Sequence, residues 1–197
     1  MAFPYNQELL DNAFTYSAYR KFIDDLLAQP PVDESAEKMR PYIEKNVGLM
    51  KKYDETYQVS DTLKTALEAG PATIWLVLTE GWCGDAAFNV PMLAAIEKAV
   101  PEKVQLRFLL RDSNLELMDA HLTDGGRSIP KLIVLSKELK DIDSWGPRPA
   151  DLQILMKSWK SDGLGLKEII PKVQQWYDAD QTKSIQKELT ALVKSYA

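Results

Sequence analysis

Sulfhydryl and imidazole groups are scarce in this sequence, which has one cysteine, Cys83, and one histidine, His121, among its 197 residues. One cysteine cannot form an internal disulfide, and a structural zinc site takes about four Cys or His ligands. The sequence therefore excludes a disulfide framework and a Cys/His zinc site built from this chain alone, and we expect no metal.

Positive charge and long hydrophobic runs are also limited. The chain carries 24 basic and 29 acidic residues, a formal net charge of −5, without a dense Lys/Arg cluster, which argues against nucleic acid as a partner. No apolar run reaches the roughly 18 residues that a membrane span needs, and Met1–Leu10 lacks the basic start and apolar core of a secretion signal. Together with the single cysteine, these features predict a cytoplasmic protein that binds neither membranes nor nucleic acid.

The two ends of the chain have the periodicity of helices. Over residues 1–70, and again beyond residue 165, apolar side chains recur three to four positions apart, which is typical of amphipathic helices. Ser60 and Gly70 supply start and stop signals for a short helix. We therefore expect a helical region at each end of the chain.

Between these regions, strands alternate with helices. Residues 73–79 form a continuous apolar run rich in β-branched and aromatic side chains, which is typical of a central strand covered on both faces. The order strand, helix, strand, helix, strand, strand, helix predicts an α/β fold with one sheet and helices able to cover both faces. The other expected strands are 104–110, 131–135 and 141–145, and the expected helices are 85–99, interrupted by Pro91, 114–122 and 149–159.

Cys83 lies between the first strand and the helix that follows it. Open α/β sheets place ligands and reactive groups at the carboxyl ends of their strands. Free backbone N–H groups at the start of a helix stabilise a thiolate, so we expect the pKa of Cys83 to lie below its usual value of about 8.5. The alternative is a small buried apolar residue.

The segment Trp82-Cys83-Gly84-Asp85-Ala86 resembles the thioredoxin active-site segment Trp-Cys-Gly-Pro-Cys. Three spacings extend the resemblance to the thioredoxin family. Pro91 falls where thioredoxins kink the active-site helix, Ile129-Pro130 resembles the loop whose cis-proline faces the cysteine, and Gly146 matches the glycine of the substrate groove.

This resemblance implies a thioredoxin-like fold, a central mixed sheet flanked by helices, for residues 71–160. Residues 1–70 are then an N-terminal helical extension and residues 161–197 a C-terminal one, and we expect all three to form one compact domain. The whole chain resembles a bacterial subgroup of the family that carries such extensions.

The departures from the family pattern bear on function. Ala86 stands where the resolving cysteine is expected, so a mixed disulfide could be released only by an external thiol. Val77 replaces the buried aspartate that thioredoxins use to move a proton. Asp85 replaces the proline, and its carboxylate either opposes the thiolate or serves as an ordinary charge at the start of the helix.

The resemblance implies that four further side chains lie near Cys83. Arg127 and Arg148 would lie on the rim, where each pairs with Asp85, supports the thiolate, holds a ligand carboxylate or is an ordinary surface arginine. Trp82 and Trp145 would form an apolar wall for a bound peptide or pack in the core. For His121 we expect an interaction at the end of its helix rather than catalysis.

Two functions fit this sequence. The first is a monothiol thioredoxin-like protein, a thiol–disulfide oxidoreductase without a resident cofactor. In it Cys83 forms mixed disulfides with a protein thiol, glutathione or another low-molecular-weight thiol, the amides of residues 84–86 stabilise the sulfur, and Ile129, Pro130 and Gly146 shape the groove. The alternative is a non-catalytic binding module that recognises a peptide or protein through the same cis-proline groove. The sequence leaves the substrate and the oligomeric state open.

Overall fold

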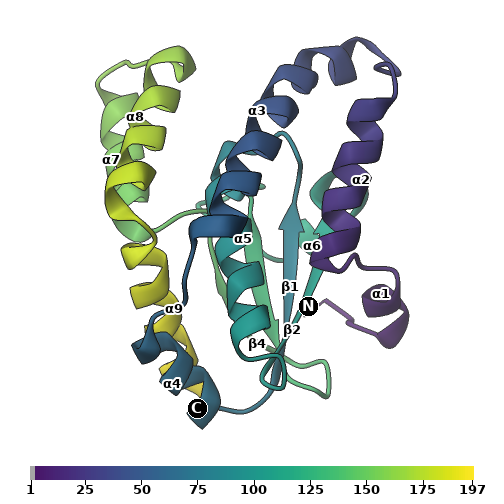
Figure 1. The fold of residues 1–197 in the computed structure, drawn as a ribbon, viewed down its shortest axis with the longest axis vertical. Helices are drawn as coiled ribbons and strands as arrows, with labels where there is room; N and C mark the ends of the chain where they lie inside the picture. The colour runs from purple at the N-terminus through teal and green to yellow at the C-terminus, as the bar shows by residue number, and fades with distance from the viewer. Residues whose placement is uncertain (1–2) are drawn as a thin grey trace.

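The computed structural model describes residues 3–197, and Figure 1 shows their fold. The strands are β1 (Thr73–Thr79), β2 (Val104–Leu110), β3 (Lys131–Leu135) and β4 (Asp141–Trp145). The helices are α1 (Gln7–Asp11), α2 (Tyr16–Ala28), α3 (Glu34–Thr56), α4 (Asp61–Ala69), α5 (Gly84–Ala99), the 3₁₀ turn η1 (Arg111–Ser113), α6 (Leu115–Asp119), α7 (Ala150–Ser161), α8 (Leu166–Asp180) and α9 (Lys183–Tyr196).

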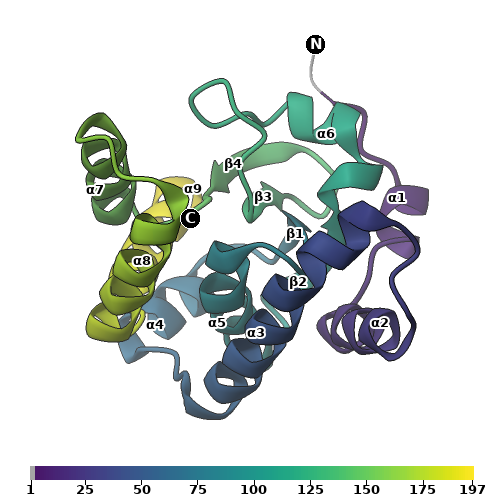
Figure 2. The same cartoon turned by 90° about the horizontal axis from the view of Figure 1, so that it is seen from above.

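The four strands form one mixed sheet in the order β2-β1-β3-β4. Strand β1 is parallel to β2 and antiparallel to β3, which is antiparallel to β4. All seven residues of the central strand β1 are buried, as a continuous apolar run requires. Helix α5 lies on one face of the sheet with α3 packed against it, and α6 lies over the other face (Figure 2). The predicted α/β fold, a mixed sheet flanked by helices, is therefore confirmed.

The helices differ from the prediction in two places. The helix expected over 114–122 is limited to α6, because the chain turns at Ala120 and Thr123 then pairs with Gly126. The helix expected to be interrupted at Pro91 is continuous over α5.

The terminal helices pack into the same core as the sheet. Leu10 of α1, Tyr19 of α2 and Leu189 of α9 belong to one buried cluster with the strands. A smaller cluster joins α3, α5, α7 and α8 through Tyr53, Phe88, Leu152 and Tyr177. The pairs α2–α3 and α7–α8 extend beyond the carboxyl end of β1 on opposite sides of it (Figure 1).

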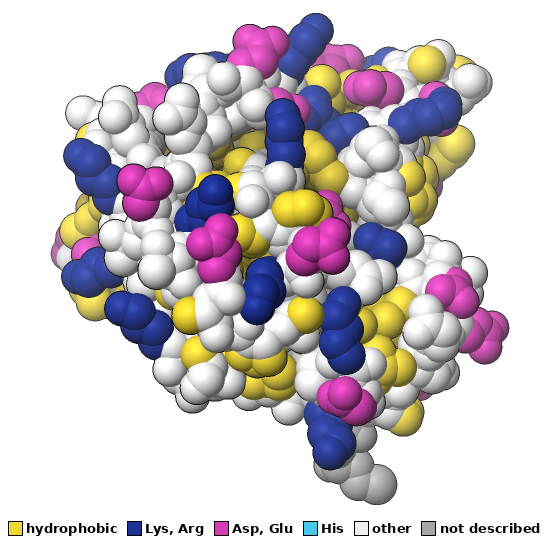
Figure 3. Space-filling view, turned by 60° about the horizontal axis from the view of Figure 1, so that its bottom comes forward, with side chains coloured by type: hydrophobic (Ala, Val, Ile, Leu, Met, Phe, Trp, Pro, Cys, Tyr) yellow, Lys and Arg dark blue, Asp and Glu magenta, His cyan; other side chains and the backbone are white. Residues whose placement is uncertain are grey.

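The surface carries charges of both signs. On the face drawn in Figure 3, Lys and Arg side chains lie among Asp and Glu side chains, with hydrophobic groups between them. Within residues 3–197, no helix combines the length and the apolar character needed to cross a membrane.

Candidate functional site

Cys83 lies at the carboxyl end of β1 and is the residue that precedes the first turn of α5. Its backbone is extended (φ −76°, ψ 118°), and its carbonyl accepts a hydrogen bond from Ala87 N–H at 3.3 Å. Its own N–H donates to Glu80 O at 3.1 Å. The sulfur therefore lies at the amino end of a helix that begins directly after a buried strand.

The thiol is nevertheless buried and protonated. Cys83 is 6% exposed, and its Sγ donates a hydrogen bond to Ile129 O at 3.2 Å. Burial, and after it the charge of Asp85, raise the pKa of Cys83 to about 12, although the N–H groups of Ala86 and Asp85 and the charge of Arg148 act in the opposite direction. The expected lowering of this pKa is thus wrong, because desolvation of the thiolate outweighs its stabilisation by the helix end.

Two loops meet beside the thiol. The Ile129–Pro130 peptide is cis, the isomer expected for this loop. Gly146, at the end of β4, has φ +113°, and a Cβ at this position would lie 2.3 Å from Pro130 O. Only a residue without a side chain fits this contact, so the structure places Gly146 directly against Pro130.

Two positions that differ from the thioredoxin pattern, 77 and 86, carry buried apolar side chains. Ala86 and Val77 are both fully buried, Ala86 in the first turn of α5 and Val77 on β1. Within residues 3–197 the thiol of Cys83 has no second thiol beside it, since the chain has a single cysteine. Gly84, by contrast, is exposed, with open space around its Cα.

Asp85 is held in a buried network. Its Oδ2 accepts hydrogen bonds from Arg148 Nε at 3.1 Å and Nη2 at 2.6 Å, and its Oδ1 accepts one from the Tyr177 hydroxyl at 2.8 Å. The side chains of Asp85 and Arg148 are 11% and 14% exposed. Asn89 of α5 donates to Tyr177 Oη at 2.9 Å and to Pro147 O at 3.3 Å. Of the roles weighed for Arg148, pairing with Asp85 is observed, and its charge also acts to lower the pKa of Cys83.

Other predicted residues lie elsewhere or have other partners. Arg127 is exposed and pairs with Asp119 at 2.7 Å instead of with Asp85. Trp145 is buried, and its indole N–H donates to Glu188 of α9 at 2.6 Å, which is the core role rather than the wall of a groove.

His121 contacts side chains far away in the sequence, and not the end of its own helix as expected. Its Nε2 lies 2.6 Å from the Tyr5 hydroxyl and 3.3 Å from Asp141 Oδ2. This cluster joins the segment before α1 to the start of β4.

An apolar cavity lies beside Trp82, the residue before Cys83. It has a volume of about 380 Å³, lies at the turn between α2 and α3, and has Trp82 as one wall. Trp82 is half-buried, and the Arg111 guanidinium lies 4.8 Å from the centre of its ring, a cation–π contact that fixes the indole. The apolar side chains that line the cavity are Leu26, Leu27, Pro30, Pro31, Val32, Ala36, Met39, Ile43 and Trp82.

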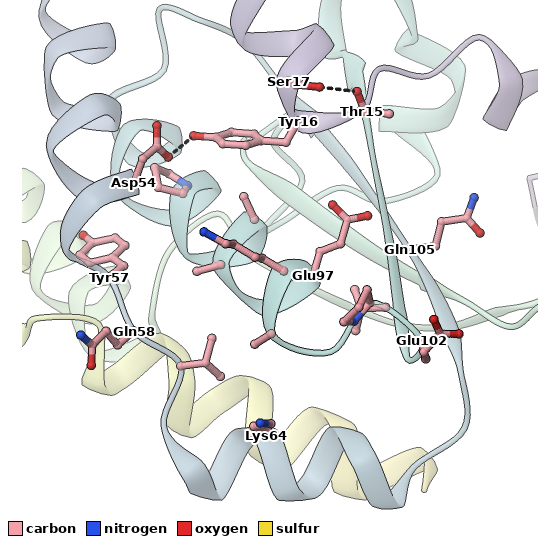
Figure 4. Close-up of a pocket in the computed structure, with 18 of the residues that line it drawn as sticks. Thr15, Tyr16, Ser17, Asp54, Tyr57, Gln58, Lys64, Glu97, Glu102 and Gln105 are labelled. Atoms are coloured by element: carbon pink, nitrogen blue, oxygen red, sulfur yellow. Dashed lines mark hydrogen bonds between the residues drawn. The ribbon is translucent and has the colours of Figure 1, made fainter.

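A larger hollow, of about 1160 Å³, lies away from Cys83. Figure 4 shows it between the start of α2, the end of α3, α4 and the outer side of α5, with Tyr16 hydrogen-bonded to Asp54 at its rim. No residue predicted for the site lines it. Its lining is open and mixes polar with apolar side chains, and we place the candidate site at Cys83.

Sequence reasoning missed Tyr177 and Asn89. Tyr177 follows the apolar period of its helix, so nothing in the sequence separates it from a packing residue. Asn89 carried a usable signal, because it is a polar side chain within the otherwise apolar and buried stretch 86–93 of α5. Among residues 3–197, no group of three or more His, Cys, Asp or Glu side chains is arranged to hold a metal ion.

Comparison with known proteins gives a family. The profile of a family described as Thioredoxin matches residues 33–160. No curated protein matches. A crystal structure of a protein of unknown function from Pseudomonas aeruginosa is similar to 99% of this chain over 100% of its own length, with a TM-score of 0.60 and 15% identity. An HIV epitope-scaffold is similar to 98% of this chain over 100% of its own, with a TM-score of 0.59 and 14% identity. At these identities the two structures show the fold alone, whereas the profile covers more than half of the chain, and the protein therefore belongs to the thioredoxin family.

Proposed function

We propose that this protein is a non-catalytic thioredoxin-fold binding module that recognises a peptide or protein segment at the apolar cavity walled by Trp82. The state of the Cys83 thiol carries the proposal. A nucleophilic cysteine needs an accessible thiolate. This thiol is 6% exposed, donates a hydrogen bond to Ile129 O and has a pKa raised to about 12. At neutral pH almost none of it is ionised.

The surface around the thiol supports recognition of an apolar group. The cavity beside Trp82 is of a size to take one large apolar side chain of a partner, and the fixed indole forms its wall. Two of the apolar residues that line the cavity are exposed, Leu26 at 41% and Val32 at 86%. The partner in this proposal is a protein or peptide, bound in the cytoplasm without a cofactor.

A second candidate is monothiol exchange, the first of the two functions drawn from the sequence. One observation favours it, since the N–H groups of Asp85 and Ala86 point at the sulfur and would stabilise a thiolate once the site opened. Because Ala86 provides no second thiol, an external thiol such as glutathione would attack the Cys83 sulfur of the mixed disulfide and release the partner as a thiol. A second glutathione would then attack the glutathione sulfur of the resulting adduct, which frees the Cys83 thiol and forms oxidised glutathione.

Thiol reactivity separates the two candidates. The rate of iodoacetamide alkylation follows the thiolate fraction, so a pKa near 12 predicts a native rate at least about a hundredfold below that of the same chain unfolded in urea. Under the binding proposal, oxidised glutathione adds no mass to the native protein. If the native protein is alkylated as fast as the unfolded chain and gains one glutathione adduct on Cys83, the result supports monothiol exchange and contradicts the binding module.

Recognition is tested with a displayed library of random peptides. Peptides selected on the wild-type protein should bind Cys83→Ser unchanged and lose binding to Trp82→Ala by about tenfold or more. Tyr42→Ala is the matched control, because Tyr42 is an exposed aromatic residue of α3 that does not line the cavity. Equal loss in Tyr42→Ala and Trp82→Ala, or selection of no peptide, contradicts recognition at this surface.

A further inference from the structure

The Asp85 carboxylate is bound from two directions by residues outside α5. Arg148, after β4, occupies Oδ2, and Tyr177, on α8, occupies Oδ1. Tyr177 itself is 6% exposed, and its ring is stacked on Phe88 with 4.1 Å between centroids. Asn89 donates to the tyrosine oxygen, so the single hydroxyl proton of Tyr177 is left for Asp85.

Tyr177 lies outside the residues that match the thioredoxin profile, which end at 160. A helix of the C-terminal extension therefore supplies one of the hydrogen bonds of a side chain only two residues from Cys83. We propose that Tyr177 is a positioning residue of the candidate site, through which α8 fixes the Asp85 carboxylate beside the Cys83 thiol. This inference takes from the proposed function only the location of the site at Cys83.

The charges around the thiol give the direction of the effect. In the described structure Asp85 is the anion that acts on Cys83 and Arg148 the cation, while Tyr19 of α2 faces the thiol with a hydroxyl whose pKa burial raises, so that it stays neutral. The Tyr177 hydroxyl partly compensates the charge on Asp85. Without it, more of that charge acts on the sulfur and opposes ionisation of the thiol.

The test measures iodoacetamide alkylation of the full-length chain against pH. Tyr177→Phe keeps the stacked ring and removes the hydroxyl, and we expect alkylation about threefold or more slower at every pH below the pKa of the thiol. Asp85→Asn should react about tenfold or more faster, because the charge that opposes the thiolate is gone. In the Asp85→Asn background, Tyr177→Phe should have no further effect, since its partner charge is absent.

Tyr53→Phe is the matched control. Tyr53 stands in the same aromatic cluster, and its hydroxyl donates to Asp178 at 3.1 Å, so the variant removes a hydroxyl without touching Asp85. Its alkylation rate should equal that of the wild type. Faster alkylation in Tyr177→Phe, an unchanged rate, an effect that persists in Asp85→Asn, or loss of folding in Tyr177→Phe would overturn the proposal. The absolute alkylation rate of the wild-type protein tests the binding module separately. Fast alkylation would contradict the binding module, whereas the ratio of the variant rates to the wild-type rate would still test the role of Tyr177.

Discussion

Cys83 shows two opposing effects at one atom. Placement at a helix end favours the thiolate by up to about 2 kcal/mol. The rise of its pKa to about 12 corresponds to several kcal/mol against the thiolate, more than the helix end supplies. Burial therefore decides the protonation state, which no spacing in the sequence reveals.

A second cysteine at position 86 tests the alignment of this site with thioredoxin. We expect Ala86→Cys to form a disulfide with Cys83 under mild oxidant, because Cys83 precedes the helix and Ala86 lies three residues later in its first turn, near enough for the two side chains to meet. The product should reduce insulin slowly, because Val77 accepts no proton and Asp85 still opposes the thiolate. The measurement is a count of free thiols, followed by insulin reduction with a limiting dithiol. Two thiols that persist under oxidant would mean that position 86 does not face Cys83.

Glu80, the residue after β1, should make stability depend on pH. Burial raises its pKa, and its Oε1 accepts a hydrogen bond from Asp112 N–H at 2.9 Å. A carboxyl whose pKa is raised on folding contributes to the free energy of unfolding. This contribution is fully present below the unfolded pKa of about 4.5 and is lost as the pH rises through the higher pKa of the folded protein. Glu80→Gln keeps the acceptor, so its free energy of unfolding should match the wild type near pH 4.5 and exceed it at neutral pH.

Urea unfolding of both proteins across this pH range is the measurement. Glu138→Gln serves as the opposite control, because Ser136 and the backbone lower the pKa of the exposed Glu138. A Glu80→Gln variant that is less stable than the wild type at neutral pH would show that the carboxylate charge itself is needed.

At the scale of elements, the sequence predicts the four strands with the bounds observed. Each strand is a short apolar run, and Gly or Pro stands close to the ends of several of them. The bounds of the strands are therefore readable from the sequence. Helix ends are less predictable, because tertiary contacts set them. Before α2 the backbone of Phe14 exchanges two hydrogen bonds of 2.8 Å with Phe108 of β2, which separates α1 from α2 within one apolar pattern. The hydrogen bond from Tyr177 to Asp85 likewise depends on how α8 packs against α5, and no local sequence pattern predicts that packing.

The junction between the loop before β3 and the end of β4 should tolerate no side chain. In Gly146→Ala the new Cβ would meet Pro130 O, and φ +113° is unfavourable for alanine. We expect a loss of about 2 kcal/mol or more in the free energy of unfolding. Gly48→Ala within α3 is the matched control, because a Cβ added there would meet no atom within 4 Å, and it should gain up to about 1 kcal/mol. Similar values for the two variants in urea unfolding would exclude the close contact at Gly146.

At the scale of the whole molecule, the question is whether the terminal helices unfold with the sheet. Ile185, Leu189 and Val193 of α9 are buried in the cluster that holds the strands, and α9 contacts both β4 and α4. Helices that share a core with the sheet lose their packing when it opens. We therefore expect one cooperative transition, with far-ultraviolet circular dichroism and tryptophan fluorescence giving the same midpoint in urea.

Leu189→Ala tests this coupling from the C-terminal end. Leu189 is fully buried, and its truncation should cost about 2–5 kcal/mol. If the chain is one cooperative unit, both probes shift by the same amount, although the substitution lies outside the residues that match the thioredoxin profile. Ile154→Ala on α7 is the control, because Ile154 is 65% exposed and its loss should change stability by less than about 0.5 kcal/mol. A helical signal that melts before the fluorescence in Leu189→Ala, while the later transition keeps the wild-type midpoint, would show that α9 is a separable addition and that residues 161–197 are not part of one compact domain.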